Sequence, residues 1–293
     1  MMDQAQQLRN VIKLRDQNLQ KTARVVTVTS GKGGVGKSNL AVNLAVQLRK
    51  EGKRVIFFDA DFGLANVEVM LGAIPQFNLS DFIYNGKSIS EIITMGPMEI
   101  GFISGGSGII GLNNLFRDQI MCLVKSLHAL DELADYLIID TGAGISDQVL
   151  EFVMASPDVI LVSTPEPSSL TDSYSLLKAL YRNPNFEEKR TKIHVVSNRV
   201  ASGEEGQAVF DKLHSVFSQF LHGELNYLGM IPQDAALEKA VRQQKPVSLL
   251  EPNAKSSKAF SILASNLLHG THEQPESRMG IGQMFANLLT RRK

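Results

Sequence analysis

The chain has 293 residues, and its 30 basic and 30 acidic side chains give a formal net charge of zero, which disfavours a nucleic-acid coat. A single cysteine, Cys122, excludes a disulfide framework and a multi-cysteine metal cluster within one chain. No apolar stretch approaches the ~18 residues of a membrane span, and the polar first twenty residues do not form a secretory signal. We therefore expect a cytoplasmic protein.

Residues 3–20 predict a polar helix, and from Arg24 onwards short β-branched runs alternate with helical patterns. The predicted strands are 25–29, 55–58, 100–104, 136–140, 159–163, 193–197 and 225–229. The predicted helices are 37–51, 117–130, 145–155, 168–181, 206–220, 234–243 and about 255–268. This alternation predicts parallel pairing, and the almost wholly apolar strands predict helices on both faces. We expect an α/β fold with a doubly wound, mostly parallel sheet flanked by helices.

A glycine-rich segment at 31–38 follows a predicted strand, precedes a predicted helix and fits the phosphate-loop pattern G-x-x-x-x-G-K-S. Glycines let backbone N–H groups turn onto phosphate oxygens, and the positive end of the next helix points at the same anion. We expect Lys37 to reach the β- and γ-phosphates and Ser38 to ligate Mg²⁺. The predicted nucleotide-binding residues here are Gly31, Lys32, Gly33, Gly34, Val35, Gly36, Lys37, Ser38 and Asn39.

The additional lysine, Lys32, is not needed by an ordinary loop of this type. Two lysines beside one triphosphate repel each other, so Lys32 is either a solvated side chain or reaches a phosphate in a facing subunit. The segment K-G-G-V-G-K-S resembles the deviant Walker A signature of the MinD/ParA ATPases. The resemblance implies that ATP promotes a face-to-face homodimer in which Lys32 touches the partner's nucleotide, and that the cofactors are ATP or ADP with Mg²⁺.

Aspartates follow two predicted strands, where the carboxyl edge of a parallel sheet places them beside a nucleotide. In D-A-D-F-G-L-A-N, 59–66, Asp59 is a candidate for holding a magnesium-bound water and Asp61 for orienting the attacking water. Helix capping is the alternative for Asp61. Asn66 matches a family position that approaches the partner's site. In D-Y-L-I-I-D-T-G-A-G, 135–144, Asp140 resembles the Walker B carboxylate that supports Mg²⁺.

Three later segments match the family's interface and base-binding positions. Glu166, Ser168 and Asp172 match residues of the dimer face, although capping explains Ser168 equally well. In S-N-R, 197–199, the resemblance assigns Asn198 to the adenine edge and Arg199 to stacking on the base. I-P-Q-D, 231–234, resembles a loop that closes over the adenine, which adds Pro232, Gln233 and Asp234 to the nucleotide site.

The C-terminal segment has two parts: 269–280 is a polar linker and 281–293 is a short amphipathic helix. One helical face carries Ile281, Met284, Phe285, Leu288 and Leu289, and the end is basic: Arg291, Arg292 and Lys293. Such a helix can lie in a lipid interface. The alternative is that the helix packs on its own domain. The two are compatible if the helix packs there in the monomer and dimerisation releases it to bind lipid. We expect reversible association with the inner face of the cell membrane.

The N-terminal segment contains D-Q-A-Q-Q-L-R, 3–9, which matches an element of the flagellar-number regulators of the FlhG (FleN or YlxH) subfamily. The resemblance covers nearly the whole chain. It implies contact with the GTPase FlhF and with flagellar C-ring or switch proteins, and regulation of flagellar number or placement. Its predicted partner-binding residues are Asp3, Gln4, Ala5, Leu8 and Arg9, with Gln4 at the catalytic centre of FlhF.

These observations predict a chain of four parts: an FlhF-activating segment (1–22), a MinD-like ATPase domain (23–268), the linker (269–280) and the membrane-targeting helix (281–293). A MinD-type division-site ATPase is one alternative, but it would begin almost at its first strand, whereas about 23 residues precede Arg24 here. A ParA-type DNA-segregation ATPase is another, and the balanced charge disfavours it. An iron–sulfur reductase of this fold needs paired cysteines, which one cysteine excludes.

Overall fold

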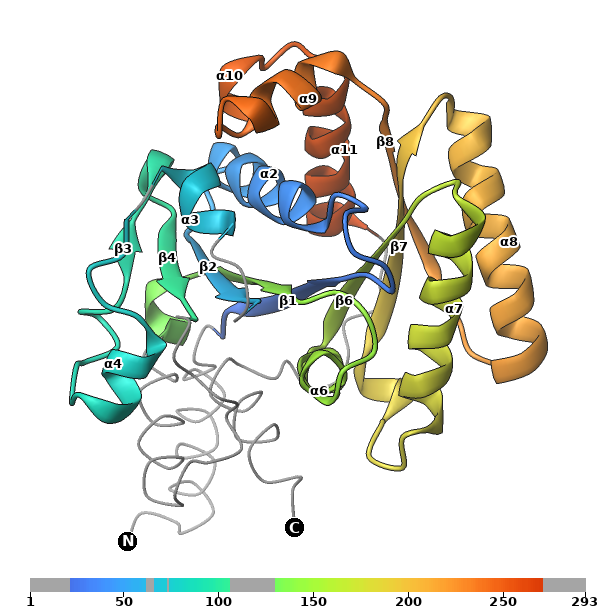
Figure 1. The fold of residues 1–293 in the computed structure, drawn as a ribbon, viewed down its shortest axis with the longest axis horizontal. Coiled ribbons are helices and arrows are strands. Elements are labelled where there is room, and N and C mark those ends of the chain that lie inside the picture. Colours follow the sequence, from blue (N-terminus) through green and yellow to red (C-terminus); the bar gives the residue numbers. More distant parts are fainter. Residues whose placement is uncertain (1–21, 62–65, 73, 106–129, 271–293) are drawn as a thin grey trace, which may run out of the picture.

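The fold is an eight-stranded sheet with helices on both faces (Figure 1). The computed structural model describes residues 22–61, 66–72, 74–105 and 130–270. The sheet order is β3-β4-β2-β5-β1-β6-β7-β8, and every neighbouring pair is parallel except β3 with β4. The strands are β1 Arg24–Thr29, β2 Val55–Ala60, β3 Thr94–Met95, β4 Gly101–Ser104, β5 Tyr136–Thr141, β6 Asp158–Ser163, β7 Lys192–Val200 and β8 Asn226–Pro232. The predicted doubly wound α/β class is confirmed.

The helices divide between the two faces of the sheet because each strand is apolar on both sides. They are α2 Lys37–Lys50, α3 Asn66–Leu71, α4 Leu79–Tyr84, α6 Asp147–Ala155, α7 Pro167–Arg182, α8 Gly203–Leu221, α9 Ala235–Arg242, α10 Val247–Leu250 and α11 Lys255–His269. On one face α2 and α11 pack against Val26, Val28 and Phe57. On the other, α6, α7 and α8 cover β6 and β7 (Figure 1). None of the described helices is long and apolar enough to cross a membrane.

The strand β1 and the helix α11 are tied together at the edge of the sheet where β1 and β6 begin. Arg24 donates a bidentate pair to Asp158 at 2.8 and 2.9 Å, and its Nη1 donates to the Leu267 carbonyl at 2.6 Å. His194 lies 3.1 Å from the same carboxylate. One guanidinium therefore joins β1, β6 and the C-terminal end of α11.

Most sequence-based boundaries agree with the structure to within a few residues, but four short elements were missed: α3, α4, β3 and α10. The helix α4 has only six residues, yet Asn78 and Asp81 form a capping box at its start. Predicted features that lie outside the described residues are the segments 1–21 and 271–293, Cys122 and most of the helix 117–130.

Candidate nucleotide-binding site

The carboxyl ends of the parallel strands meet at one edge of the sheet, and the phosphate loop lies there between β1 and α2. Gly36 is the N-cap of α2 and adopts a left-handed conformation with φ +95°, which favours glycine. No side chain caps α2, and its first turn has no acidic residue. The N–H groups at the start of this 14-residue helix are thus available for an anion.

Two glycines let the loop approach its neighbours closely. A Cβ on Gly31 would lie 2.2 Å from the backbone carbonyl of Asp172 in α7. A Cβ on Gly36 would lie 2.3 Å from the side-chain nitrogen of Asn198 at the end of β7. Only glycine fits at these two positions, so the loop is held between α7 and β7.

Below the loop, Lys37 and the carboxyl groups of Asp59 and Asp140 form a buried group. Lys37 Nζ donates to Asp140 Oδ1 at 2.7 Å, and both side chains are almost inaccessible to solvent. Asp59 on β2 is the register partner of Asp140 on β5. Burial and then the adjacent Asp140 raise the pKa of Asp59 to about 8. Burial also raises the pKa of Asp140, although Lys37 and Ser38 oppose this shift.

This group has the ligands that a small divalent cation prefers. Asp140 Oδ2 is buried and has no hydrogen-bond partner among the described residues. A bound cation would stabilise the ionised forms of these two neighbouring carboxyl groups and so lower both pKa values. The described residues contain no cluster of three His, Cys, Asp or Glu side chains able to hold a metal ion. The remaining ligands would come from phosphate and water, as is usual for Mg²⁺.

Asp61 faces the loop that follows β5. Its backbone N–H donates to Asp59 Oδ1 at 3.1 Å, and its carboxylate lies 3.7 Å from where a Cβ on Gly142 would be. Gly144 in turn donates to the Ser30 carbonyl at 2.9 Å, which fixes this loop beside the phosphate loop. Because α3 begins five residues later, at Asn66, Asp61 is not at its N-cap. The side chain of Asn66 is outside the description.

Lys32 points away from the buried group around Lys37 and contacts the first turn of α7. Its Nζ lies 2.7 Å from Glu166 Oε2 and 2.7 Å from Ser168 Oγ. The Lys32 side chain is 36% exposed, against 8% for Lys37. The hydrogen bond from Lys32 lowers the pKa of Glu166. Glu166, rather than Ser168, is the N-cap residue of α7, and no side chain caps this helix.

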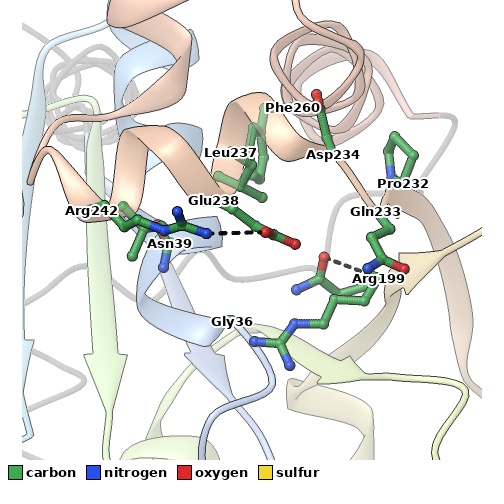
Figure 2. A pocket seen from close by; sticks show the side chains of 12 residues that line it. Gly36, Asn39, Arg199, Pro232, Gln233, Asp234, Leu237, Glu238, Arg242 and Phe260 are labelled. Atoms are coloured by element: carbon green, nitrogen blue, oxygen red, sulfur yellow. Dashed lines mark hydrogen bonds and ion pairs between the residues drawn. The ribbon is translucent and has the colours of Figure 1, made fainter.

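A cavity of about 470 Å³ opens beside Gly36 (Figure 2). It brings together all the residues predicted for the base and one residue predicted with the phosphate loop, Asn39. The base-site residues are Asn198, Arg199, Pro232, Gln233 and Asp234. Sequence reasoning missed the wall contributed by α9 and α11: Leu237, Glu238, Val241, Arg242 and Phe260. Leu237 and Val241 lie four residues apart on one helix face, and this spacing is the signal that could have found them.

Two of the residues predicted to bind the base already make hydrogen bonds within the protein. Asn198 donates to the Val35 carbonyl at 2.7 Å and accepts from Arg199 N at 2.9 Å, which leaves one donor and one acceptor on its amide. Asp234 caps α9 through Ala236 N at 3.0 Å and accepts from Ser256 N and Oγ at 2.9 and 2.8 Å. Asp234 therefore ties the start of α9, which lines the pocket, to the start of α11.

Two groups of predicted residues belong to segments that the structure does not describe. The partner-binding residues at 3–9 and the amphipathic face at 281–293 lie outside the described residues.

Comparison with known proteins identifies similar chains. A family model described as ParA, NUBPL iron-transfer P-loop NTPase, matches residues 21–268. The antiactivator FleN of Pseudomonas aeruginosa is 39% identical over 83% of this chain and 86% of its own. The flagellum site-determining protein YlxH of Helicobacter pylori is 32% identical over 99% of both chains. The crystal structure of the cell division ATPase MinD from Pyrococcus furiosus superposes with a TM-score of 0.65 at 24% identity, covering 84% of this chain and 98% of its own.

Proposed function

Because the chain belongs to the ParA/MinD family of P-loop NTPases, we propose that it hydrolyses ATP with Mg²⁺ and uses ATP-dependent dimerisation as a switch that regulates flagellar number or placement. The observation that carries the proposal is the contrast between the two lysines of the phosphate loop. Lys37 is buried against Asp140, whereas Lys32 is half-exposed and faces outwards.

In the proposed reaction the phosphate loop and Lys37 bind the β- and γ-phosphates, and the N-terminus of α2 stabilises their charge. Ser38, Asp59 and Asp140 would hold Mg²⁺, which neutralises charge on the transferred phosphoryl group. Asp61, beside Gly142, orients the attacking water. Asn198 uses its remaining donor and acceptor on adenine N7 and N6, a pairing that guanine does not offer.

The position of Lys32 supports the proposed dimerisation. Its contacts with Glu166 and Ser168 are near the surface, so an incoming triphosphate of a second copy can replace them at low cost. Asp61→Ala should bind ATP, fail to hydrolyse it and accumulate as a dimer in sedimentation velocity. Adding Lys32→Ala to that variant should return it to monomer, while the surface control Lys258→Ala should not. An Asp61→Ala protein that stays monomeric with ATP would contradict the proposal.

The flagellar part of the proposal is supported by the similarity to FleN and to YlxH, which extends over 99% of this chain. Residues 3–9 contact FlhF and stimulate its GTP hydrolysis, and other surfaces meet flagellar switch or C-ring proteins. A peptide of residues 1–20 should accelerate GTP turnover by FlhF, and the same peptide with Gln4→Ala should not. Equal turnover with and without the peptide would remove the FlhF assignment.

Membrane association is assigned to the segment 281–293, which lies after α11. One short amphipathic helix binds weakly, and two on a dimer bind by avidity. Full-length protein with ATP should pellet with anionic liposomes, and a chain ending at residue 280 should stay in the supernatant. Replacing Leu288 by glutamate, which keeps the length, should give the same loss. Pelleting that survives both changes would refute the assignment.

A further inference from the structure

Two of the described residues that line the base pocket are acidic, and their situations differ. The carboxylate of Asp234 already accepts three hydrogen bonds, one from Ala236 and two from Ser256. Glu238, one turn further along α9, extends its side chain across the middle of the pocket above Gly36 (Figure 2). Among the described residues its one ion pair is with Arg242, at 3.7 Å. The Glu238 carboxylate is thus free to accept hydrogen bonds from a ligand.

Of the three parts of a nucleoside triphosphate, which are phosphates, base and ribose, only the ribose suits this carboxylate. The phosphates are anionic and belong at the N-terminus of α2, so a carboxylate would repel them. The base edge has its own donor and acceptor in the Asn198 amide. The ribose lies between base and phosphates and carries two adjacent hydroxyl donors. A carboxylate has two oxygens that accept from such a pair.

We propose that Glu238 is a specificity-determining residue that accepts hydrogen bonds from the ribose 2′- and 3′-hydroxyls and selects ribonucleotides over deoxynucleotides. The inference deepens the proposed function and rests on it. Arg242 pairs with Glu238 only at 3.7 Å, and the two side chains are 80% and 56% exposed. Such a surface pair is weak, so the ribose hydroxyls displace it easily.

The test measures the affinity of the full chain for ATP, 2′-deoxyATP and 3′-deoxyATP with Mg²⁺, by isothermal titration. The wild type should bind ATP about tenfold more tightly than either deoxynucleotide, the value of one hydrogen bond to a charged acceptor. Glu238→Ala should weaken ATP binding about a hundredfold, because two hydrogen bonds are lost, and should weaken each deoxynucleotide about tenfold, because one is lost, so that the preference for ATP disappears. Glu238→Gln keeps one acceptor oxygen and should lie between. The control Glu204→Gln, an exposed acid on α8, should match the wild type.

Three outcomes overturn the inference. One is a Glu238→Ala protein that still prefers ATP tenfold. Another is equal weakening of ATP and deoxyATP, which would mean a general effect on the pocket. The third is a variant that loses discrimination against purine riboside triphosphate, which lacks the 6-amino group, because the carboxylate would then read the base. A wild type that binds no nucleotide at all would instead overturn the proposed function together with this inference.

Discussion

Replacing Asp59 by asparagine should make the nucleotide-free protein more stable at neutral pH, although the change removes a proposed Mg²⁺ ligand. Asp59 is almost fully buried, and burial together with Asp140 raises its pKa to about 8. In the unfolded chain the same carboxyl group ionises near its ordinary value of 3.8. Asparagine has nearly the same shape, can still accept from Asp61 N and does not ionise in either state.

The sign follows from proton binding. Between pH 4 and pH 8 the folded wild type keeps a proton on Asp59 that the unfolded chain has lost, so stability falls as pH rises through this window. The slope for one proton is about 1.36 kcal/mol per pH unit. From pH 5 to pH 7 the wild type should lose about 3 kcal/mol from this group. The advantage of Asp59→Asn should grow by the same amount, as an upper limit.

The assay is urea unfolding of both proteins at pH 5, 6 and 7, without nucleotide or Mg²⁺. The difference between the two proteins at each pH cancels the other titrating groups. Asp211→Asn, an exposed acid on α8, is the matched control and should show a pH profile parallel to that of the wild type. Parallel profiles for wild type and Asp59→Asn would refute the reasoning, because the buried carboxyl group would then titrate at its ordinary pKa.

Two further changes test other parts of the fold. Burial raises the pKa of Asp158, but hydrogen bonds from Arg24 and His194 outweigh this effect and hold the pKa below its usual range. Asp158→Asn should therefore cost about 3–5 kcal/mol of unfolding free energy at pH 7, and the deficit should shrink below pH 4; a pH-independent deficit would contradict the ion-pair account. Gly36→Ala should abolish ATP binding, because its new Cβ would meet the Asn198 side chain. Gly52 has a similar positive φ but nothing within 4 Å of its Cβ position, so Gly52→Ala should cost only about 1 kcal/mol of strain. If the two variants showed equal losses of melting temperature and both still bound ATP, the steric argument would be refuted.

The strands and the phosphate site could be predicted from the sequence because their signals are local. The run Val55–Phe58 is apolar on both faces, so it must lie inside a sheet covered on both sides. Parallel topology then places Asp59, Asp140 and Asn198 at one edge without further information. The motif that contains Lys37 fixes which strand lies at the centre of the site.

The features that were missed depend on contacts between distant residues. Asp234 accepts a hydrogen bond from Ser256, 22 positions later, and no local sequence pattern predicts that bond. Glu238 lies on what reads as an ordinary solvated helix face, and only the packing of α9 over Gly36 turns its side chain into the pocket. Lys32 was expected to project away from its own pocket, but its docking on Glu166 required the position of α7, which is 134 residues distant in sequence.

The bond from Arg24 to the Leu267 carbonyl brings the first strand and the last helix of the domain within the reach of one side chain. A domain with neighbouring ends can be circularly permuted. A short glycine-rich connection from residue 270 back to residue 22, with new ends between the exposed residues Pro184 and Asn185, would keep every described strand in its place. Such a protein would keep the eight-stranded sheet and its helices without the segments 1–21 and 271–293.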